Sequence, residues 1–428
     1  MTRGQASPGP GRAAASSEGR EHTRFRRGRD LPLLVAALAL SSMGDFLAIV
    51  ALTIRIHDSS GSGWAVSALL LAGLLPLIVF APVGGLLVDR YETTRVLVFA
   101  SLIQAVVAVA LAYVESIPGI LALVFLLNMG LAVTQPGFFA LVPRVAGEDR
   151  VTEANAFLEL ARYGGATFGP VLAGGLAAGV GVRYALLGDS LTFVVVAVCC
   201  LALTVRLPAT RTHDEQGRLQ SELAREGARF ILRDRLLRLV LGVMAISVLF
   251  AATSNVAAVF FAKDVLHAGN TGFGLMEAAW AGGMAIVAIA VARGRKPSSL
   301  VVAALASAVI MGGSLVVTGL FALLPVAVAL YLVGGGANGM ENIAMRSLIH
   351  ARTPEQMRGR VYAAYSALGT GAQVASMGLG GLMVTLLGAR STLLVAGTCG
   401  LAVGALGLAL FSRTQVGEAA GPEGLKTG

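Results

Sequence analysis

The sequence has few charged residues. Asp, Glu, Lys and Arg make up 13% of its 428 residues, whereas 56% are hydrophobic. Soluble domains carry roughly 25% charged residues, so this shortfall indicates a chain that crosses a membrane several times. Lysine is especially scarce, and none of the three lysines follows a glycine. The sequence therefore contains no Gly-Lys-Ser/Thr phosphate loop, and we expect no ATP-driven step within this chain.

Cysteine and histidine are also rare. The three cysteines fall inside apolar stretches, without the spacing of a disulfide framework or a metal site. The five histidines lie in tails, in loops or at the ends of apolar segments, which argues against a histidine proton relay in the membrane. The sequence also contains neither a zinc-protease pattern nor a Gly-x-Ser-x-Gly elbow. We therefore predict that the protein is not an enzyme and has no metal or organic cofactor.

Long apolar runs dominate the chain. A helix needs about 20 apolar residues to cross a bilayer, and the runs do not alternate as barrel strands do. We identify twelve such segments, at about 31–55, 64–88, 94–114, 118–141, 155–180, 184–205, 237–262, 271–292, 298–319, 324–347, 360–387 and 390–411. The sequence thus predicts an all-α integral membrane protein with twelve transmembrane helices in two six-helix bundles.

The basic residues are unevenly placed between these segments. The two tails and every second loop hold 28 of the 33 Lys and Arg residues, and the other loops hold four. By the positive-inside rule, both termini lie in the cytoplasm of a protein of the plasma or inner membrane. The same rule accounts for the net charge of +9, so we expect no nucleic-acid partner.

The segments divide the chain into five parts. We expect a disordered cytoplasmic tail over 1–30, an N-terminal six-helix bundle over 31–205, a cytoplasmic loop over 206–236, a C-terminal six-helix bundle over 237–411 and a cytoplasmic tail over 412–428. Within the loop, Leu223 and Phe230 are seven residues apart in a basic stretch. This pattern predicts an amphipathic helix at the cytoplasmic membrane surface.

A short charged turn separates the second and third segments and carries Gly85, Asp89, Arg90 and Arg95. It resembles the loop between helices 2 and 3 of the major facilitator superfamily, whose members are secondary transporters. The resemblance implies that this turn contacts the eleventh helix, which begins near Arg360, and holds the cytoplasmic side closed. The alternative is an ordinary polar turn with positive-inside charges.

The fifth segment contains Gly165, Gly169, Pro170 and Gly174. These residues resemble the antiporter signature of the same superfamily, with Ala173 in place of one glycine, and the resemblance implies export. Small residues let helix backbones approach closely, so generic helix packing is the alternative.

Three further stretches resemble the branch of macrolide-efflux proteins and the enterobactin exporter: Gly44-Asp45, 226–230 and 358–362. Drug–proton antiporters of the superfamily often carry an arginine where this chain has Leu126.

Ionisable groups inside a membrane are costly and are functional candidates by default. Asp45 and Glu341 are our candidates for proton coupling, and a structural packing role is the alternative for each. Arg162 is the one basic residue within a segment, and we expect it to pair with Glu159, either as a gating or as a structural ion pair. We expect Asp189 and Glu277 to reach water near the outer face.

The remaining polar candidates for coupling or substrate binding are Asn342, Asn128, Gln135, Asn255 and Gln373. Phe46, Phe138, Phe139, Phe260 and Trp280 could offer apolar surface to a substrate.

Together these features predict a monomeric secondary transporter in the lipid bilayer. We expect it to export a hydrophobic small molecule, such as a macrolide-like drug or a siderophore, by alternating access driven by a proton gradient. A non-transporting membrane sensor or scaffold of the same fold, a lipid flippase and an importer are the alternatives.

Overall fold

The computed structural model describes residues 10–147, 150–205, 216–295, 297 and 299–419, and the secondary structure in these ranges is helical. The N-terminal part contains α1 (Pro10–Ser60), α2 (Gly63–Val79), α3 (Ala81–Arg90), α4 (Thr93–Tyr113), α5 (Ile117–Ala146), α6 (Val151–Gly179) and α7 (Val182–Ala202). The C-terminal part contains α8 (Gln216–Arg233), α9 (Arg235–Ala251), α10 (Ser254–Phe260), the π-helix η2 (Phe261–Val265), α11 (Gly269–Ala292), α12 (Leu300–Leu320), α13 (Leu324–Arg352) and α14 (Glu355–Ala419).

Within the described residues, every apolar segment expected from the sequence lies mainly on one helix or on consecutive helices. Among the described residues, eight helices are long and apolar enough to cross a membrane, and a ninth span results if α2 and α3, which meet at 48°, are taken together. The 65-residue helix α14 is interrupted at Gly388, whose φ of 78° is not helical. The long helices α6 and α13 are less apolar, because glycine and charged or amide side chains interrupt them. The all-helical membrane fold is confirmed, and the count of twelve spans stays a prediction.

The helices extend further toward both ends of the chain than the composition predicts. Residues 10–29 belong to α1, where we expected a disordered tail, and residues 412–419 of the expected C-terminal tail belong to α14. Alanine, arginine and glutamate favour helix, and they are frequent in the stretch that precedes the first apolar segment. The remainder of both tails, 1–9 and 420–428, lies outside the described residues, as does 206–215 of the central loop.

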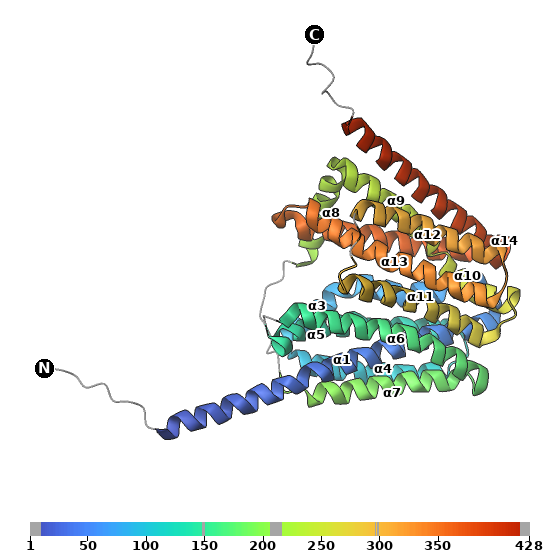
Figure 1. Ribbon diagram of the computed structural model, residues 1–428. Helices are drawn as coiled ribbons and strands as arrows, with labels where there is room; N and C mark the ends of the chain where they lie inside the picture. Colours follow the sequence, from blue (N-terminus) through green and yellow to red (C-terminus); the bar gives the residue numbers. More distant parts are fainter. Residues whose placement is uncertain (1–9, 148–149, 206–215, 296, 298, 420–428) are drawn as a thin grey trace, which may run out of the picture.

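The helices form two groups, which we call the N-terminal helices (α1–α7) and the C-terminal helices (α8–α14). In Figure 1 the N-terminal helices, in blue and green, occupy the lower part and the C-terminal helices, in yellow-green to red, the upper part. Within the first group α1 packs against α6 and α7, and within the second α12 packs against α13 and α14. The two groups meet chiefly where α6 packs against α11 and where α2 packs against α14.

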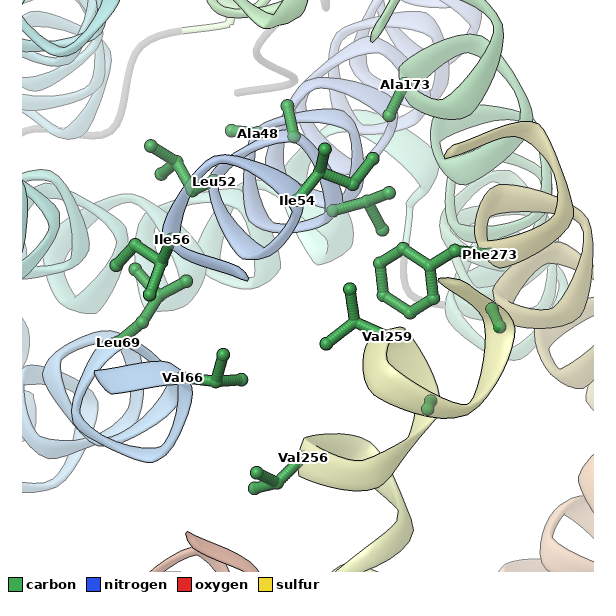
Figure 2. Packing of buried hydrophobic residues seen from close by; sticks show 14 of the residues in the cluster. Ala48, Leu52, Ile54, Ile56, Val66, Leu69, Ala173, Val256, Val259 and Phe273 are labelled. Atoms are coloured by element: carbon green, nitrogen blue, oxygen red, sulfur yellow. The ribbon is translucent and has the colours of Figure 1, made fainter. Parts of the chain in front are cut away.

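The two groups share a hydrophobic core at only one end. The end that carries residues 89–95, 216–238 and 346–360 is called the arginine-rich end, and the opposite one the arginine-poor end. One core cluster draws on both groups and includes Ile54 and Ile56 at the end of α1 together with Val259 of α10 and Phe273 of α11. Figure 2 shows these side chains from different helices converging on one region.

At the arginine-rich end each group has a core of its own. One cluster there contains residues from 34 to 203 and the other residues from 231 to 364. The second includes Ile231 of α8, so the amphipathic helix packs its apolar side on the C-terminal helices. Gly227 allows this approach, because a Cβ atom at that position would lie 1.9 Å from the Arg360 carbonyl oxygen. The protein is therefore packed shut at the arginine-poor end and divided at the arginine-rich end.

The four basic residues of the arginine-poor end each have a partner in the fold. Arg55 donates a hydrogen bond of 2.7 Å to the Leu111 carbonyl near the end of α4. Arg390 donates one of 2.8 Å to the Gly319 carbonyl at the end of α12. These carbonyls have no partner within their own helices, and a cation there also suits the helix dipole. Arg183 lies over the Tyr113 ring, and Lys263 belongs to a polar network described below.

Candidate functional site

A cavity of about 280 Å³ lies between the two groups of helices. Its lining comes from α1, α2 and α6 on one side and from α10 and α11 on the other. The lining residues are Phe46, Ile49, Val50, Thr53, Leu70, Arg162, Tyr163, Ala166, Asn255, Phe273, Glu277, Trp280, Ala281 and Met284. The walls are mainly apolar, with one basic and one acidic side chain among them. This composition is that of a small-molecule site, in which a few polar groups orient a ligand against apolar walls.

Several residues expected to face a substrate line this cavity. Arg162 and Asn255 do so, as do the aromatic residues Phe46 and Trp280. Arg162 also makes the expected contact with Glu159, through its Nε at 3.2 Å and its terminal guanidinium nitrogen at 2.9 Å from the carboxylate.

The other polar candidates lie elsewhere. Asn128 donates to the Val124 carbonyl of its own helix at 2.9 Å, and Asn342 donates in the same way to Asn338. Gln135 and Gln373 are absent from the cavity lining. Phe138 is buried in the core of the N-terminal helices and Phe260 in the shared core, and neither lines the cavity.

A second carboxyl group, that of Asp189, lies within electrostatic reach of Asp45 where α1 contacts α7. Asp189 of α7 is 0% exposed, and its Oδ1 would lie 2.4 Å from a Cβ atom at Gly44 of α1. Its Oδ2 has no hydrogen-bond partner among the described residues. The charge of Asp45 acts directly on Asp189. Our expectation that Asp189 reaches water is wrong, because α1 covers its side chain.

Glu341 is buried in α13 and is 1% exposed. Both of its carboxylate oxygens lack a hydrogen-bond partner within the described ranges. Tyr365 of α14 lies within electrostatic reach of the carboxyl group. Glu341 thus has the burial that we expect of a proton carrier, although it is absent from the cavity lining.

Glu277 is the acidic residue that sequence reasoning undervalued. It lies in α11 and faces the cavity together with Trp280, which follows it by three residues. Residues three apart lie on one face of a helix. From the sequence we interpreted Glu277 as a residue near the outer surface. The sequence feature that indicates a cavity position is a carboxylate three residues before a tryptophan within an apolar segment.

The glycines of α6 face two different helices. Cβ atoms at Gly165 and Gly169 would lie 2.6 Å from backbone atoms of Met43 in α1. One turn further, a Cβ atom at Gly174 would lie 2.7 Å from the Asn270 carbonyl oxygen of α11, and one at Gly274 would lie 2.3 Å from the Pro170 carbonyl oxygen. We call the contact of Pro170 and Gly174 with α11 the α6–α11 seam. It joins the N-terminal to the C-terminal helices beside the cavity.

A polar network closes the arginine-poor end next to the seam. His57 of α1 contacts Asp58 through Nδ1 at 3.0 Å and Asp264 of η2 through Nε2 at 3.2 Å. Lys263 pairs with Asp58 and donates to the Asn270 side-chain oxygen at 2.8 Å. The His57 ring also packs edge-on against Phe260, with centroids 4.7 Å apart. These contacts connect α1 to η2 and α11, and therefore link the two groups of helices.

The charged turn at the arginine-rich end makes local contacts. Arg95 pairs with Glu92 at 2.7 Å. Within the described residues no hydrogen bond or ion pair joins Asp89 to Arg360, which pairs with Glu226 at 2.5 Å. The close backbone approach in α3 is at Gly84, where a Cβ atom would lie 2.1 Å from the Ala132 carbonyl oxygen, whereas Gly85 has open space around its Cα. Among the described residues, Asp89, Arg90 and Arg95 therefore make no hydrogen bond or ion pair with the C-terminal helices in this conformation.

A membrane protein with a cavity between two groups of helices, closed at one end and divided at the other, has the architecture of an alternating-access secondary transporter. Comparison with known families agrees. The chain matches the Major Facilitator Superfamily over residues 34–376, and it belongs to that family. It is thus a multi-pass membrane transporter and not an enzyme.

Curated relatives are distant in sequence. The chain is 24% identical over 395 residues to the uncharacterized MFS-type transporter YfiS of Bacillus subtilis (strain 168), covering 91% of this chain and 94% of that protein. It is 27% identical over 367 residues to the enterobactin exporter EntS of Citrobacter koseri, covering 82% and 83%. A shorter match of 127 residues, also 27% identical, covers 28% of this chain and 31% of macrolide efflux protein A of Streptococcus pyogenes.

Solved structures show the same fold at lower identity. A POT family transporter in complex with a thioalcohol-conjugated peptide superposes with a TM-score of 0.72 at 11% identity, covering 90% of this chain and 96% of that one. The nucleoside transporter NupG superposes with a TM-score of 0.69 at 14% identity, covering 90% and 100%.

The α6–α11 seam yields a first prediction. Gly174→Ala places a methyl group against the Asn270 carbonyl, whereas Gly175→Ala places it in open space. Overpacking costs about 1–3 kcal/mol, so we expect Gly174→Ala to lower the thermal unfolding midpoint of the purified protein. Gly175→Ala is the matched control and should leave the midpoint unchanged. Equal midpoints for the two variants would show that the seam is not tightly packed.

The closing network yields a second prediction. Lys263→Met removes the cation that connects Asp58 to Asn270, and a hydrogen bond to a charged group is worth about 1.5–3 kcal/mol. We therefore expect the arginine-poor end to open more often. The reporter is Ala173→Cys, at a fully buried position in the shared core, in a chain whose three native cysteines are replaced. Its reaction with a membrane-impermeant maleimide should become about tenfold faster.

Arg390→Met is the control for this measurement. It removes a cation at the same end that contacts only α12, within the C-terminal helices. An unchanged labelling rate in Lys263→Met, or an equal increase in Arg390→Met, would show that the network does not hold the end closed.

Proposed function

We propose that the protein is a proton-coupled exporter of a hydrophobic small molecule, such as a macrolide-like drug or a siderophore. Twelve transmembrane helices in two six-helix bundles, over 31–205 and 237–411, rock about the cavity to expose it to either side of the plasma or inner membrane. Both termini, the loop 206–236 and the arginine-rich end are cytoplasmic. One chain suffices for transport, and the energy comes from the proton gradient.

The observation that carries the proposal is the mainly apolar cavity between the two groups of helices, sealed on the arginine-poor side by the shared core and the His57 network. With the arginine-rich end in the cytoplasm, this conformation is the one that admits a substrate from inside the cell. Export is supported by the glycines of α6, which resemble the antiporter signature, and by the names of two relatives, an enterobactin exporter and a macrolide efflux protein.

Proton coupling is assigned to carboxyl groups that are absent from the cavity lining. Asp45 and Asp189 lie together at the contact of α1 with α7, where two nearby carboxylates can share one proton. Glu341 lies in α13 without a hydrogen-bond partner among the described residues. A change of protonation at either place alters the packing of a helix in one of the two groups. The turn with Gly85, Asp89, Arg90 and Arg95 then forms its contacts with α14 when the arginine-rich end closes.

Transport into inverted vesicles tests the proposal. We expect an imposed proton gradient to drive uptake of a macrolide or a siderophore into inverted membrane vesicles that contain the protein. Asp45→Asn keeps the shape of the side chain and removes its acidity, and it should abolish gradient-driven uptake. Glu355→Gln, at an exposed acid that begins α14, is the control and should transport like the unaltered protein.

Other outcomes point elsewhere. Gradient-driven uptake that is unchanged in Asp45→Asn would contradict a coupling role for Asp45. Glu341 would then be the candidate, and Glu341→Gln would test it. Uptake that a protonophore does not reduce would contradict proton coupling. If no compound is taken up, the sensor, importer and lipid flippase alternatives gain support.

A further inference from the structure

The cavity contains one acidic side chain that the protein does not neutralise. The positive charge of Arg162 is neutralised by Glu159 on the same helix, because Nε and one terminal guanidinium nitrogen both lie within 3.2 Å of the Glu159 carboxylate. Glu277 enters from the opposite side, on α11. Within the described residues no hydrogen bond or ion pair holds its carboxylate. On the side of α6, the charge of Arg162 is therefore neutralised by Glu159. On the side of α11, the Glu277 carboxylate has no counter-charge from the described residues.

Aromatic rings surround this carboxylate. Trp280 lies one turn away on the same face of α11, and Phe46, Tyr163 and Phe273 complete the aromatic part of the lining. An edge-on contact with Tyr331, with ring centroids 5.9 Å apart, positions the indole. Aromatic faces attract cations, and the attraction strengthens where water is excluded.

Tyr331 also connects Glu277 to α13. Its hydroxyl group is buried without a hydrogen-bond partner in the described ranges, and it lies within electrostatic reach of the Glu277 carboxylate. The phenol can therefore support the carboxylate from the protein side, while the cavity side remains open to a ligand.

We propose that the cavity binds a hydrophobic organic cation, such as a protonated or quaternary amine, with its charge against Glu277 and its apolar part against Trp280 and the neighbouring rings. The inference rests on the proposed transport function and specifies the substrate class of the same cavity. An anionic ligand would meet Arg162, whose charge Glu159 already compensates, and would be repelled by Glu277. A neutral ligand would leave the Glu277 carboxylate without a counter-charge among the mainly apolar walls of the cavity, which is costly.

Binding to the purified full chain can be followed by tryptophan fluorescence. The chain has two tryptophans, and Trp64 is 49% exposed, away from the cavity. Trp64→Phe therefore leaves Trp280 as the single fluorophore in the cavity wall. The probes are benzyltrimethylammonium, its uncharged carbon isostere neopentylbenzene and the anion phenylmethanesulfonate. The first two have the same shape and differ only in charge.

We expect saturable changes in Trp280 emission with the cation, and binding at least about tenfold weaker for the neutral isostere and the anion. Glu277→Gln should weaken cation binding by at least about tenfold, since truncating one partner of a buried charge pair is costly. Glu153→Gln is the matched control: it removes one carboxylate at an exposed position of α6 and should leave binding unchanged.

Three results would overturn the inference: equal affinity for the cation and its isostere, tighter binding of the anion, or full cation affinity in Glu277→Gln. The comparison of probes needs no substitution at Glu277, so it decides even if that variant does not fold. Because the assay measures binding alone, cation binding without uptake into vesicles would contradict the transport function. Uptake of neutral compounds without cation selectivity would contradict only this inference.

Discussion

The close approach of α6 and α11 is the contact on which the rest of the structure depends. At Gly174 and Gly274 the two backbones are so near that a single added carbon would meet a carbonyl oxygen. This seam joins the N-terminal to the C-terminal helices, and the same two helices supply Arg162 and Glu277 to the cavity beside it. Small residues and backbone atoms make this contact, whereas the shared core at the same end supplies the larger apolar side chains, among them Val259 and Phe273.

Charge inside the membrane is the second constraint on this fold. An isolated charge at the centre of a bilayer costs about 2.5–3.5 kcal/mol on insertion scales, and most charges of this chain avoid that cost. Arg55 and Arg390 donate to carbonyls at helix ends, and Arg162 pairs with Glu159. Asp45, Asp189, Glu277 and Glu341 are the exceptions. Glu277 faces the cavity and the other three are absent from its lining, so the acidic group that we propose for a ligand is separate from those that we propose for protons.

The helices were predictable from the sequence because a bilayer imposes a minimum length on each apolar segment. The family was predictable because short charged and glycine-rich motifs occur between and within those segments. The ends of the helices were less predictable: apolar length says nothing of how far a helix continues into water, and α1 begins well before its apolar segment.

The cavity was only partly predictable. Arg162, Asn255, Phe46 and Trp280 were expected to face a substrate and line the cavity, whereas Gln135 and Gln373 do not. The reason is rotational. An apolar helix has little amphipathicity when lipid covers its outer side, so the sequence does not show which face turns inward. For the same reason the sequence does not show that Gly84, rather than its neighbour Gly85, makes the close contact with α5. Asp189 was misjudged because its cover comes from α1, far away in the sequence.

Distances across both ends of the molecule test the central claim, that the two groups of helices rock about the cavity. Spin labels at exposed positions Tyr91 and Gln356 would report on the arginine-rich end, and labels at Ser60 and Leu323 on the arginine-poor end. Pulsed electron resonance on each pair should give two distance populations. Addition of a transported ligand or a change of pH should shift the two pairs in opposite directions, one shortening as the other lengthens. Single, unchanging distances at both ends would contradict alternating access and leave a rigid protein with the fold of a transporter.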